Sequence, residues 1–320
     1  MGYSKSTWRM ALLASSGLAL AATATGAVAF AQSEKDTSGA ILEIHDFIGT
    51  IKIIEGSQLS YELDMGDNLV DKPNIQLESG KLVVDGDNDA SVRNCKSNND
   101  KIQLKLKGGD LRDLKDFPEL VVTLPAGSNA RIGLDSGLLK AGDLNNLELD
   151  FSGCGDAYFS DVKNAIDISI RGSGDVTGKS SHQANVSIKG SGDFKIGDVS
   201  GPVNLDIAGS GDAKFGDISQ AFKVKVMGSG DVRAKSAAEV VSVEVKGSGD
   251  VEIDGGTAKN ISINVFGSGD VEFNGTADDV SVLLKGSGDV YVARLTGKKV
   301  VERHGSGDVR IGSWSSDDRD

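Results

Sequence analysis

Apolar and polar residues alternate with a period of two along most of the chain. In residues 241–245 and 251–253, valine and isoleucine occupy every second position, and the pattern returns in residues 261–265 and 271–273. Strict alternation predicts β-strands that bury one face and expose the other. The prevalence of β-branched residues on the apolar face also favours strands over helices.

A short glycine-containing motif recurs with this alternation. Gly-Ser-Gly-Asp occurs eight times, a ninth copy that begins at Gly153 has Cys154 in the serine position, and successive copies are 18 to 20 residues apart. Residues 135–138 resemble a degenerate earlier copy. The glycines of the eight complete copies are Gly172 and Gly174, Gly190 and Gly192, Gly209 and Gly211, Gly228 and Gly230, Gly247 and Gly249, Gly267 and Gly269, Gly286 and Gly288, and Gly305 and Gly307. The aspartates that close the nine copies are Asp156, Asp175, Asp193, Asp212, Asp231, Asp250, Asp270, Asp289 and Asp308.

The alternation of apolar and polar positions continues through the motif, so the same set of even-numbered positions is apolar before and after it. Counted from the first glycine, most copies have apolar residues at positions −6, −4, −2, +4 and +6. Both glycines then face inward, and the serine and the aspartate face outward. We expect the glycine pair on the inside of a sharp corner, where a side chain has no room and glycine tolerates the backbone angles. Val162, Val199, Ile218 and Leu295 recur at position +9 and predict a short third side.

A single repeat cannot be stable alone, because its few buried aliphatic side chains do not offset the entropy cost of ordering about 19 residues. Stacked repeats share a continuous core and exchange backbone hydrogen bonds at a spacing of about 4.8 Å. The sequence therefore predicts an all-β fold, a right-handed parallel β-helix (β-solenoid) with rungs of about 19 residues, the hand following the rule for parallel crossover connections. A β-sandwich is the alternative, but the constant period and the lack of hairpin turns make it less favourable.

The N-terminal segment has the features of a secretory signal peptide. Lys5 and Arg9 precede an apolar run, and Ala29 and Ala31 place small residues before a cleavage site at Gln32. An uncleaved membrane anchor is the alternative, although the apolar run is short. We therefore expect residues 1–31 to be removed, the mature chain to be exported to the periplasm, cell surface or extracellular space, and no transmembrane segment to remain.

The remaining chain divides into three further parts. Residues 39–134 contain strands at irregular spacing, which we interpret as irregular N-terminal rungs or a cap over an edge that would otherwise invite aggregation. A separate small β domain is the alternative for this part. Residues 135–312 are the regular Gly-Ser-Gly-Asp β-helix, and residues 313–320 are a charged tail.

Composition and charge exclude several kinds of partner. The 320 residues carry a formal net charge of −13, which argues against binding to nucleic acid and against docking on anionic membranes. The two cysteines, Cys95 and Cys154, can form a disulfide in an exported protein, but they can equally be small buried apolar residues. The sequence leaves their pairing open.

No constellation of catalytic residues is visible in the sequence. His45, His182 and His304 occur in unrelated contexts, and the repeating carboxylates leave no unique acid pair of the kind that glycoside hydrolases use. We expect no enzymatic activity and no cofactor. Stacked aspartates repel one another, so the ladder needs either hydrogen bonds from turn N–H and serine hydroxyl groups or a Ca²⁺ ion between rungs. We favour hydrogen bonds, because known calcium-binding repeats have a nine-residue period.

The repeats resemble a known family. The Gly-Ser-Gly-Asp rungs behind a strand-rich leader, together with Leu-Val-Val-Thr-Leu-Pro-Ala-Gly at residues 120–127, resemble the auto-transporter adhesin head or GIN-domain family over about residues 40–312. The resemblance implies a single-stranded right-handed β-helix in a bacterial envelope and an adhesin-like module that binds an envelope protein or glycan. A periplasmic structural or carbohydrate-binding β-helix is the alternative, and a polysaccharide-degrading enzyme is the least favoured.

Overall fold

The computed structural model describes residues 39–86, 90–98 and 101–312. The predicted signal peptide and the charged tail lie outside these residues. Among the residues described, no helix is long and apolar enough to cross a membrane.

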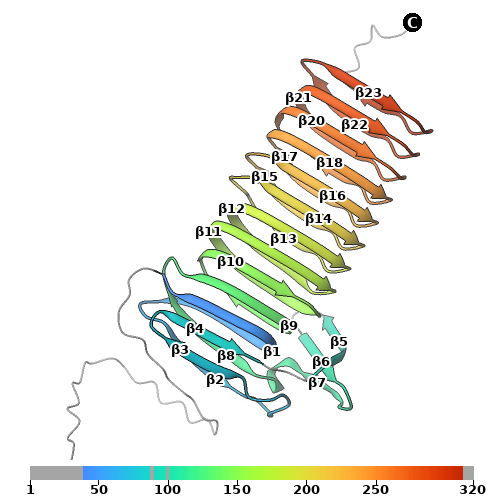
Figure 1. The fold of residues 1–320 in the computed structure, drawn as a ribbon. Helices are drawn as coiled ribbons and strands as arrows, with labels where there is room; N and C mark the ends of the chain where they lie inside the picture. Colours follow the sequence, from blue (N-terminus) through green and yellow to red (C-terminus); the bar gives the residue numbers. More distant parts are fainter. Residues whose placement is uncertain (1–38, 87–89, 99–100, 313–320) are drawn as a thin grey trace, which may run out of the picture.

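Parallel strands stack in a single file and form an elongated β-solenoid of about ten turns (Figure 1). The predicted all-β fold with rungs of about 19 residues is confirmed, and its right-handed sense stays a prediction. The strands at the N-terminal end are β1 (Ile41–Gly56), β2 (Ser60–Asp64), β3 (Asn74–Glu78), β4 (Lys81–Asp85), β5 (Val92–Asn98), β6 (Lys101–Leu106), β7 (Leu111–Asp113) and β8 (Glu119–Pro125), with the one-turn 3₁₀ helix η1 (Leu114–Asp116). The following strands are β9 (Asn129–Ala141), β10 (Leu144–Phe151), β11 (Gly155–Gly172), β12 (Asp175–Gly190), β13 (Phe194–Ile196), β14 (Val203–Gly209), β15 (Ala213–Ile218), β16 (Phe222–Gly228), β17 (Val232–Ala237), β18 (Glu239–Gly247), β19 (Val251–Ile253), β20 (Thr257–Val265), β21 (Val271–Leu284), β22 (Val290–Leu295), β23 (Lys299–Arg303) and β24 (Val309–Ile311).

The register between rungs places like residues above one another. Val224 of β16 lies between Leu205 of β14 and Val243 of β18. These inward residues are 1% exposed, whereas Ser248 and Asp250 of the motif are exposed. The residues predicted to face inward therefore form the core. They belong to one buried cluster that runs along the whole stack.

Repeats of unequal length are accommodated away from the motif corner. The 20-residue repeat carries its extra residue at Lys259, where the pairing of β18 with β20 shifts by one. In the 18-residue repeat, the pairing of β11 with β12 shifts between Val162 and Ala165. Bulges of this kind absorb a residue without disturbing the rest of the ladder, so the motif stays in register in every rung.

The corner glycines are required by the approach of neighbouring rungs. Gly209 and Gly228 have φ values of 151° and 150°, and a Cβ on Gly228 would lie 2.1 Å from the carbonyl oxygen of Gly209. The second glycine meets the same obstacle, since a Cβ on Gly230 would lie 2.1 Å from the carbonyl oxygen of Gly211. The close contact is with the backbone of the preceding rung, along the stacking axis. The sequence-based reason, lack of room in the interior, is therefore incomplete.

Antiparallel strands lie at the N-terminal end of the stack. β1 pairs in parallel with β4, β8 and β9, while β2 runs antiparallel to β8 and β3 antiparallel to β4. Most buried apolar residues of β1, β4, β8 and β9 belong to the same cluster as those of the repeats. The division of the chain at residue 134 stays a prediction.

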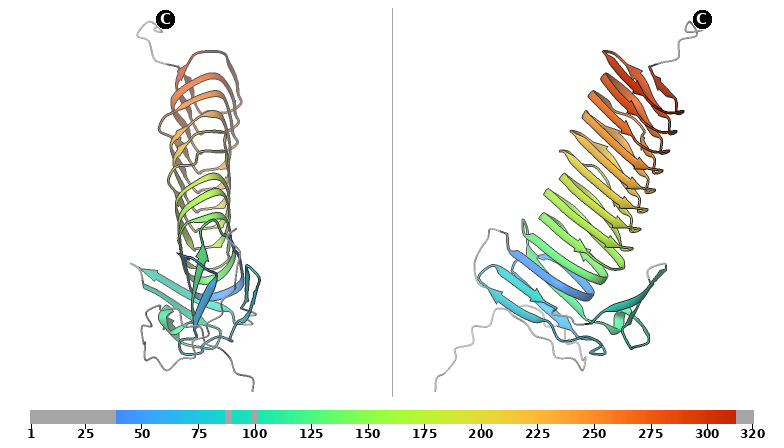
Figure 2. Two further views of the ribbon diagram at one scale, coloured as in Figure 1. Left: turned by 90° about the vertical axis from the view of Figure 1, so that its left-hand side faces the viewer. Right: turned by 45° about the vertical axis from the view of Figure 1, so that its right-hand side comes forward.

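A small three-stranded sheet projects from the side of the first rungs (Figure 2). We call residues 92–98 and 101–116, which form β5, β6, β7 and η1, the side lobe. Ile102, Leu104 and Leu114 of the lobe form a second buried cluster with Ile48 and Phe117. A disulfide between Cys95 and Cys154, with the Cα atoms 6.4 Å apart, ties the lobe to the first copy of the motif. The serine-to-cysteine exchange in that copy thus provides the attachment point.

The C-terminal rung differs from the others on its inward side. Positions −6, −4 and −2 are apolar in the preceding rungs, but here they are Lys299, Val301 and Arg303. All of β23 is exposed, and Val301 is 44% exposed. Arg303 Nη1 donates to the carbonyl oxygen of Gly307 at 3.2 Å. Inward-pointing charges are a known protection of open sheet edges, and these residues mark the end of the stack.

Candidate functional site

The motif aspartates form a continuous hydrogen-bonded ladder along one corner of the solenoid. In seven successive steps, the backbone N–H of one aspartate donates to Oδ1 of the aspartate one rung earlier. The donors and acceptors are Asp193 to Asp175, Asp212 to Asp193, Asp231 to Asp212, Asp250 to Asp231, Asp270 to Asp250, Asp289 to Asp270 and Asp308 to Asp289, with N···O distances of 2.7 to 2.9 Å. Each bond stabilises a carboxylate that its neighbours repel.

The hydrogen bonds of the ladder come from the next rung, and serine hydroxyl groups form a separate row. Ser268 Oγ donates to Ser248 Oγ at 3.1 Å. At the N-terminal end of the ladder, Asp156 accepts a hydrogen bond from Ser97 of the side lobe at 3.4 Å. The lobe therefore covers the beginning of the ladder, and the ladder is open from Asp175 onward.

Burial opposes ionisation at one step of the ladder. Burial raises the pKa of the Asp175 carboxyl, the charge of Asp193 raises it further, and the hydrogen bond from the Asp193 backbone N–H lowers it. The ionised form of Asp175 is thus less favourable in the folded protein than in the unfolded chain.

A row of basic residues runs beside the central part of the ladder. Lys195, Lys214 and Arg233 lie two residues after their motif aspartates and pair in register between rungs. In the next rung Glu252 takes this position and forms an ion pair with Arg233. The outward face therefore presents parallel rows of opposite charge.

A second set of aspartates lies near the third side and was not predicted from the sequence. Asp217 accepts hydrogen bonds from Lys235 Nζ and Ser236 Oγ, both at 2.6 Å. Asp161, three rungs earlier, accepts from Lys179 and Ser180 in the same way. The hydrogen bond from the lysine, followed by that from the serine, lowers the pKa of each aspartate. The recurrence of aspartate eight residues after the first motif glycine is a signal that could have revealed this set.

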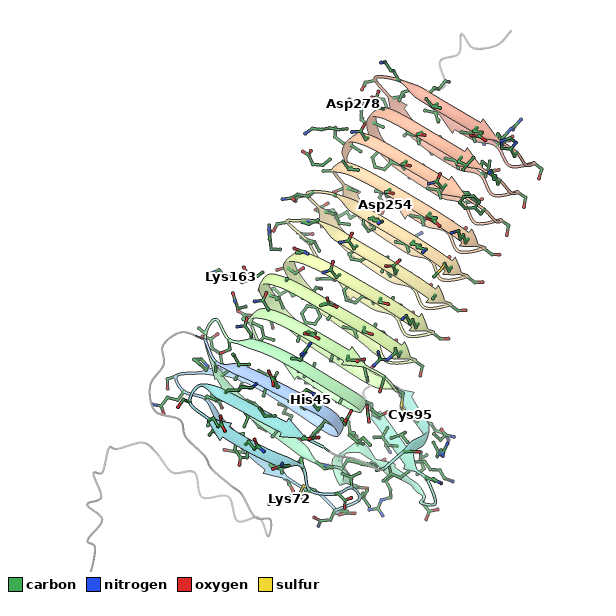
Figure 3. The ribbon with its side chains drawn as sticks, in the orientation of Figure 1. His45, Lys72, Cys95, Lys163, Asp254 and Asp278 are labelled. Atoms are coloured by element: carbon green, nitrogen blue, oxygen red, sulfur yellow. A yellow bond between two sulfur atoms is a disulfide. The ribbon has the colours of Figure 1, made fainter. Side chains whose placement is uncertain are left out.

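The structure does not bring the three histidines together. His182 Nδ1 lies 2.9 Å from Ser200 Oγ, and His304 Nε2 lies 2.6 Å from Glu302 Oε1. His45 is on β1 (Figure 3). Within residues 39–86, 90–98 and 101–312, no group of three or more His, Cys, Asp or Glu side chains is arranged to hold a metal ion.

Depressions lie on the surface of the described residues at the N-terminal half of the stack, and three of them are well defined. A groove of about 470 Å³ follows the third side and is lined by Asp143, Asp161, Lys163, His182 and Ser200 among others. A second of about 420 Å³ lies beside stacked asparagines, in which Asn146 Nδ2 donates to Asn129 Oδ1 at 2.8 Å. The third, of about 220 Å³, separates the side lobe from β9 and β11. Figure 3 shows Cys95 where the lobe meets the first rungs.

Comparison with known proteins finds a family that the C-terminal repeats resemble. Residues 198–313 match a family model described as "Putative auto-transporter adhesin, head GIN domain", which confirms the resemblance seen in the sequence over this part of the chain. No protein with a curated description matches the chain.

Solved structures with similar chains are distant in sequence. A "putative adhesin" from Bacteroides fragilis is 15% identical, with 89% of this chain and 97% of that chain covered and a TM-score of 0.35. A "putative adhesin" from Parabacteroides distasonis is 14% identical, with 90% and 98% covered and a TM-score of 0.39. A "putative lipid binding protein" from the same species is 18% identical, with 90% and 97% covered and a TM-score of 0.31.

Proposed function

We propose that this protein is an exported, non-catalytic interaction module of the bacterial cell envelope with an adhesin-like role. The match of the regular rungs to the adhesin head family carries the proposal. Export rests on the basic and apolar residues of the N-terminal segment and on the disulfide, which suits an oxidising compartment.

The architecture supports binding to an extended or repetitive partner. Outward side chains recur at one position per rung, so a row such as Lys195, Lys214 and Arg233 offers the same kind of contact at a spacing of about 4.8 Å. Weak contacts repeated along a rigid rod add up when the partner engages several of them at once. A catalytic centre needs a unique arrangement of side chains, which a row of repeated contacts does not provide. We therefore propose that the protein has no catalytic activity and no cofactor.

Binding of the mature chain to envelope material tests the proposal. Labelled protein that begins at Gln32 should bind intact cells or isolated envelopes in a saturable manner, and heat-unfolded protein should not. Absence of saturable binding to both preparations would contradict an interaction role. Mass spectrometry of the exported protein should find an N-terminus at or near Gln32, and an intact Met1 would contradict export.

A further inference from the structure

The cleft beside the side lobe combines charged, aromatic and apolar groups. Its volume is about 220 Å³, below the roughly 300–1,000 Å³ of pockets for drug-sized ligands, so it suits one small ring. Leu138, Lys140, Asp156 and Tyr158 of β9 and β11 form one wall, and Lys101, Ile102, Asp113, Leu114 and Lys115 of the lobe form the other.

The cleft is positively charged in a strongly acidic protein. Three lysines and two aspartates line it, which gives a formal charge of +1, whereas the whole chain carries −13. Lys101 Nζ lies 3.4 Å from Asp113 Oδ1. Lys115 attracts the Asp113 carboxylate. No ion pair within 4.0 Å joins Lys115 or Lys140 to another side chain in the described part of the chain, so both ammonium groups can pair with a ligand. One surplus positive charge matches a ligand with one carboxylate better than a dianionic phosphate.

An aromatic ring stands beside the available lysine. Tyr158 lies next to Lys140 in the register between β11 and β9, and it is 39% exposed. Together with the half-buried Leu138, its ring offers an apolar surface on which the C–H face of a pyranose can lie. Asp113 and Asp156 can accept hydrogen bonds from sugar hydroxyl groups.

We propose that this cleft binds one uronic acid unit of an acidic polysaccharide. Lys115 and Lys140 pair with the sugar carboxylate, and Tyr158 stacks against the ring. This inference rests on the proposed function and names the chemical class of the envelope partner at one site.

The disulfide holds the two walls of the cleft together. Cys154 is two residues before Asp156 on the solenoid side, and Cys95 is on β5 of the lobe. Because the lobe's buried cluster is small, removal of this tie should loosen the wall that carries Lys101 and Lys115. The Cys95→Ser, Cys154→Ser double variant should therefore bind uronate more weakly.

Calorimetric titration with acidic oligosaccharides tests the proposal. The probes are trimers of galacturonate, mannuronate and glucuronate, each compared with its methyl ester, which keeps the sugar rings but replaces the charged carboxylate with a neutral group that is larger by one methyl. We expect at least one acidic trimer to bind and its ester to bind at least about tenfold more weakly. Inorganic phosphate should not compete at equal concentration.

Matched variants distinguish the cleft from the rest of the surface. Tyr158→Ala should weaken binding at least about tenfold, while Tyr291→Ala, which lies at the same place in its repeat and is equally exposed at 39%, should not. Lys140→Gln should weaken binding, while Lys285→Gln, at an exposed outward position of a later rung, should not. These side chains are on the surface, so an unchanged thermal midpoint verifies folding.

Several outcomes would overturn the inference. These are no binding of any acidic trimer, equal binding of acid and ester, equal losses at Tyr158 and Tyr291, or competition by phosphate, which would indicate a simple anion site. A different result would contradict the proposed function. If the wild-type protein binds uronate but does not bind envelopes, the adhesin-like role is wrong. If the Tyr158→Ala protein still binds envelopes, only the cleft's role in adhesion is wrong.

Discussion

At the corner of each rung, we expect the first glycine to be sensitive to substitution and the serine that follows it to tolerate substitution. Gly247 has a φ of 149°, and a Cβ there would lie 2.1 Å from the carbonyl oxygen of Gly228. Ser248 follows it in the chain and is exposed. Gly247→Ala should lower the free energy of unfolding by about 3 kcal/mol, and Ser248→Ala by less than about 0.5 kcal/mol. Urea unfolding measures both, and a larger loss at Ser248 would contradict the stacking role of the glycine.

The two sets of aspartates should respond to pH in opposite senses. The pKa of Asp161 is lowered, so its contribution to stability is present above the ordinary value of 3.8 and is lost as the pH falls through the folded value. The pKa of Asp175 is raised, so stability is lost as the pH rises through the folded value. Asp161→Asn should therefore destabilise the protein at neutral pH, and Asp175→Asn should stabilise it.

Both differences should shrink in acid, because the carboxyl groups of the wild-type protein are then protonated in the folded and unfolded chains alike. The measurement is the thermal midpoint of each variant, relative to that of the wild-type protein, from neutral pH to a pH below the ordinary carboxylate pKa. Parallel curves for Asp161→Asn and Asp175→Asn would show that the two environments do not differ.

At the scale of single elements, we expect β23 in the C-terminal rung to prevent growth of the stack by end-to-end association. β23 places Lys299 and Arg303 on the inward phase, where earlier rungs have apolar residues. The Lys299→Val, Arg303→Val double variant should associate end to end, because an apolar open edge attracts a further strand. Light scattering should show assembly that increases with concentration.

The matched control for this prediction is Lys246→Val, Lys285→Val. These lysines are at outward positions of earlier rungs, so the control removes the same charge without exposing a core edge. Equal assembly of the two double variants, or a monomeric Lys299→Val, Arg303→Val protein, would contradict a capping role for the last rung.

The regular elements could be predicted from the sequence because their apolar period and their motif repeat together. Val243 is buried and Glu244 is not, as the phase requires. The side lobe could not be predicted, since an antiparallel sheet at irregular spacing leaves no repeated signal. Cys154, which replaces serine in a single copy of the motif, indicated where the lobe is attached to the solenoid. The presence of two cysteines alone does not establish a disulfide.

The candidate site was only partly predictable for a similar reason. The aspartate ladder was visible as a repeated residue, and its outward direction followed from the phase. The source of its hydrogen bonds, the N–H of the next rung, depends on how rungs stack and has no local signature. The cleft at Tyr158 brings residues 101–115 of the lobe against residues 138–158 of the first rungs, and only the folded lobe creates it.

At the scale of the whole molecule, the response to calcium distinguishes two roles of the aspartate ladder. Oδ1 of seven ladder aspartates, from Asp175 to Asp289, already accepts a backbone N–H. We expect the thermal midpoint to be the same in millimolar Ca²⁺ and in a monovalent salt of matched ionic strength. A midpoint that rises only with Ca²⁺, and no longer rises in the Asp231→Asn, Asp250→Asn, Asp270→Asn variant, would instead identify an ion site.

The rungs should be equivalent units of one stack, arranged along one axis. Because each rung contacts mainly its neighbours, two complete rungs can be removed without disturbing the rest. Deletion of residues 210–247 joins Gly209 to Ser248 and keeps the motif phase, since Gly209, Gly228 and Gly247 stack in register. A deletion of residues 210–237 ends within a rung and is the control.

Small-angle X-ray scattering of the two deletion proteins is the most direct measurement. Removal of residues 210–247 should leave a folded rod that is shorter by about 10 Å, two spacings of about 4.8 Å, with cooperative unfolding retained. The out-of-phase deletion should lose its ordered rod shape. An unfolded in-phase protein, an unchanged length, or equal behaviour of the two deletions would contradict the stack of equivalent rungs.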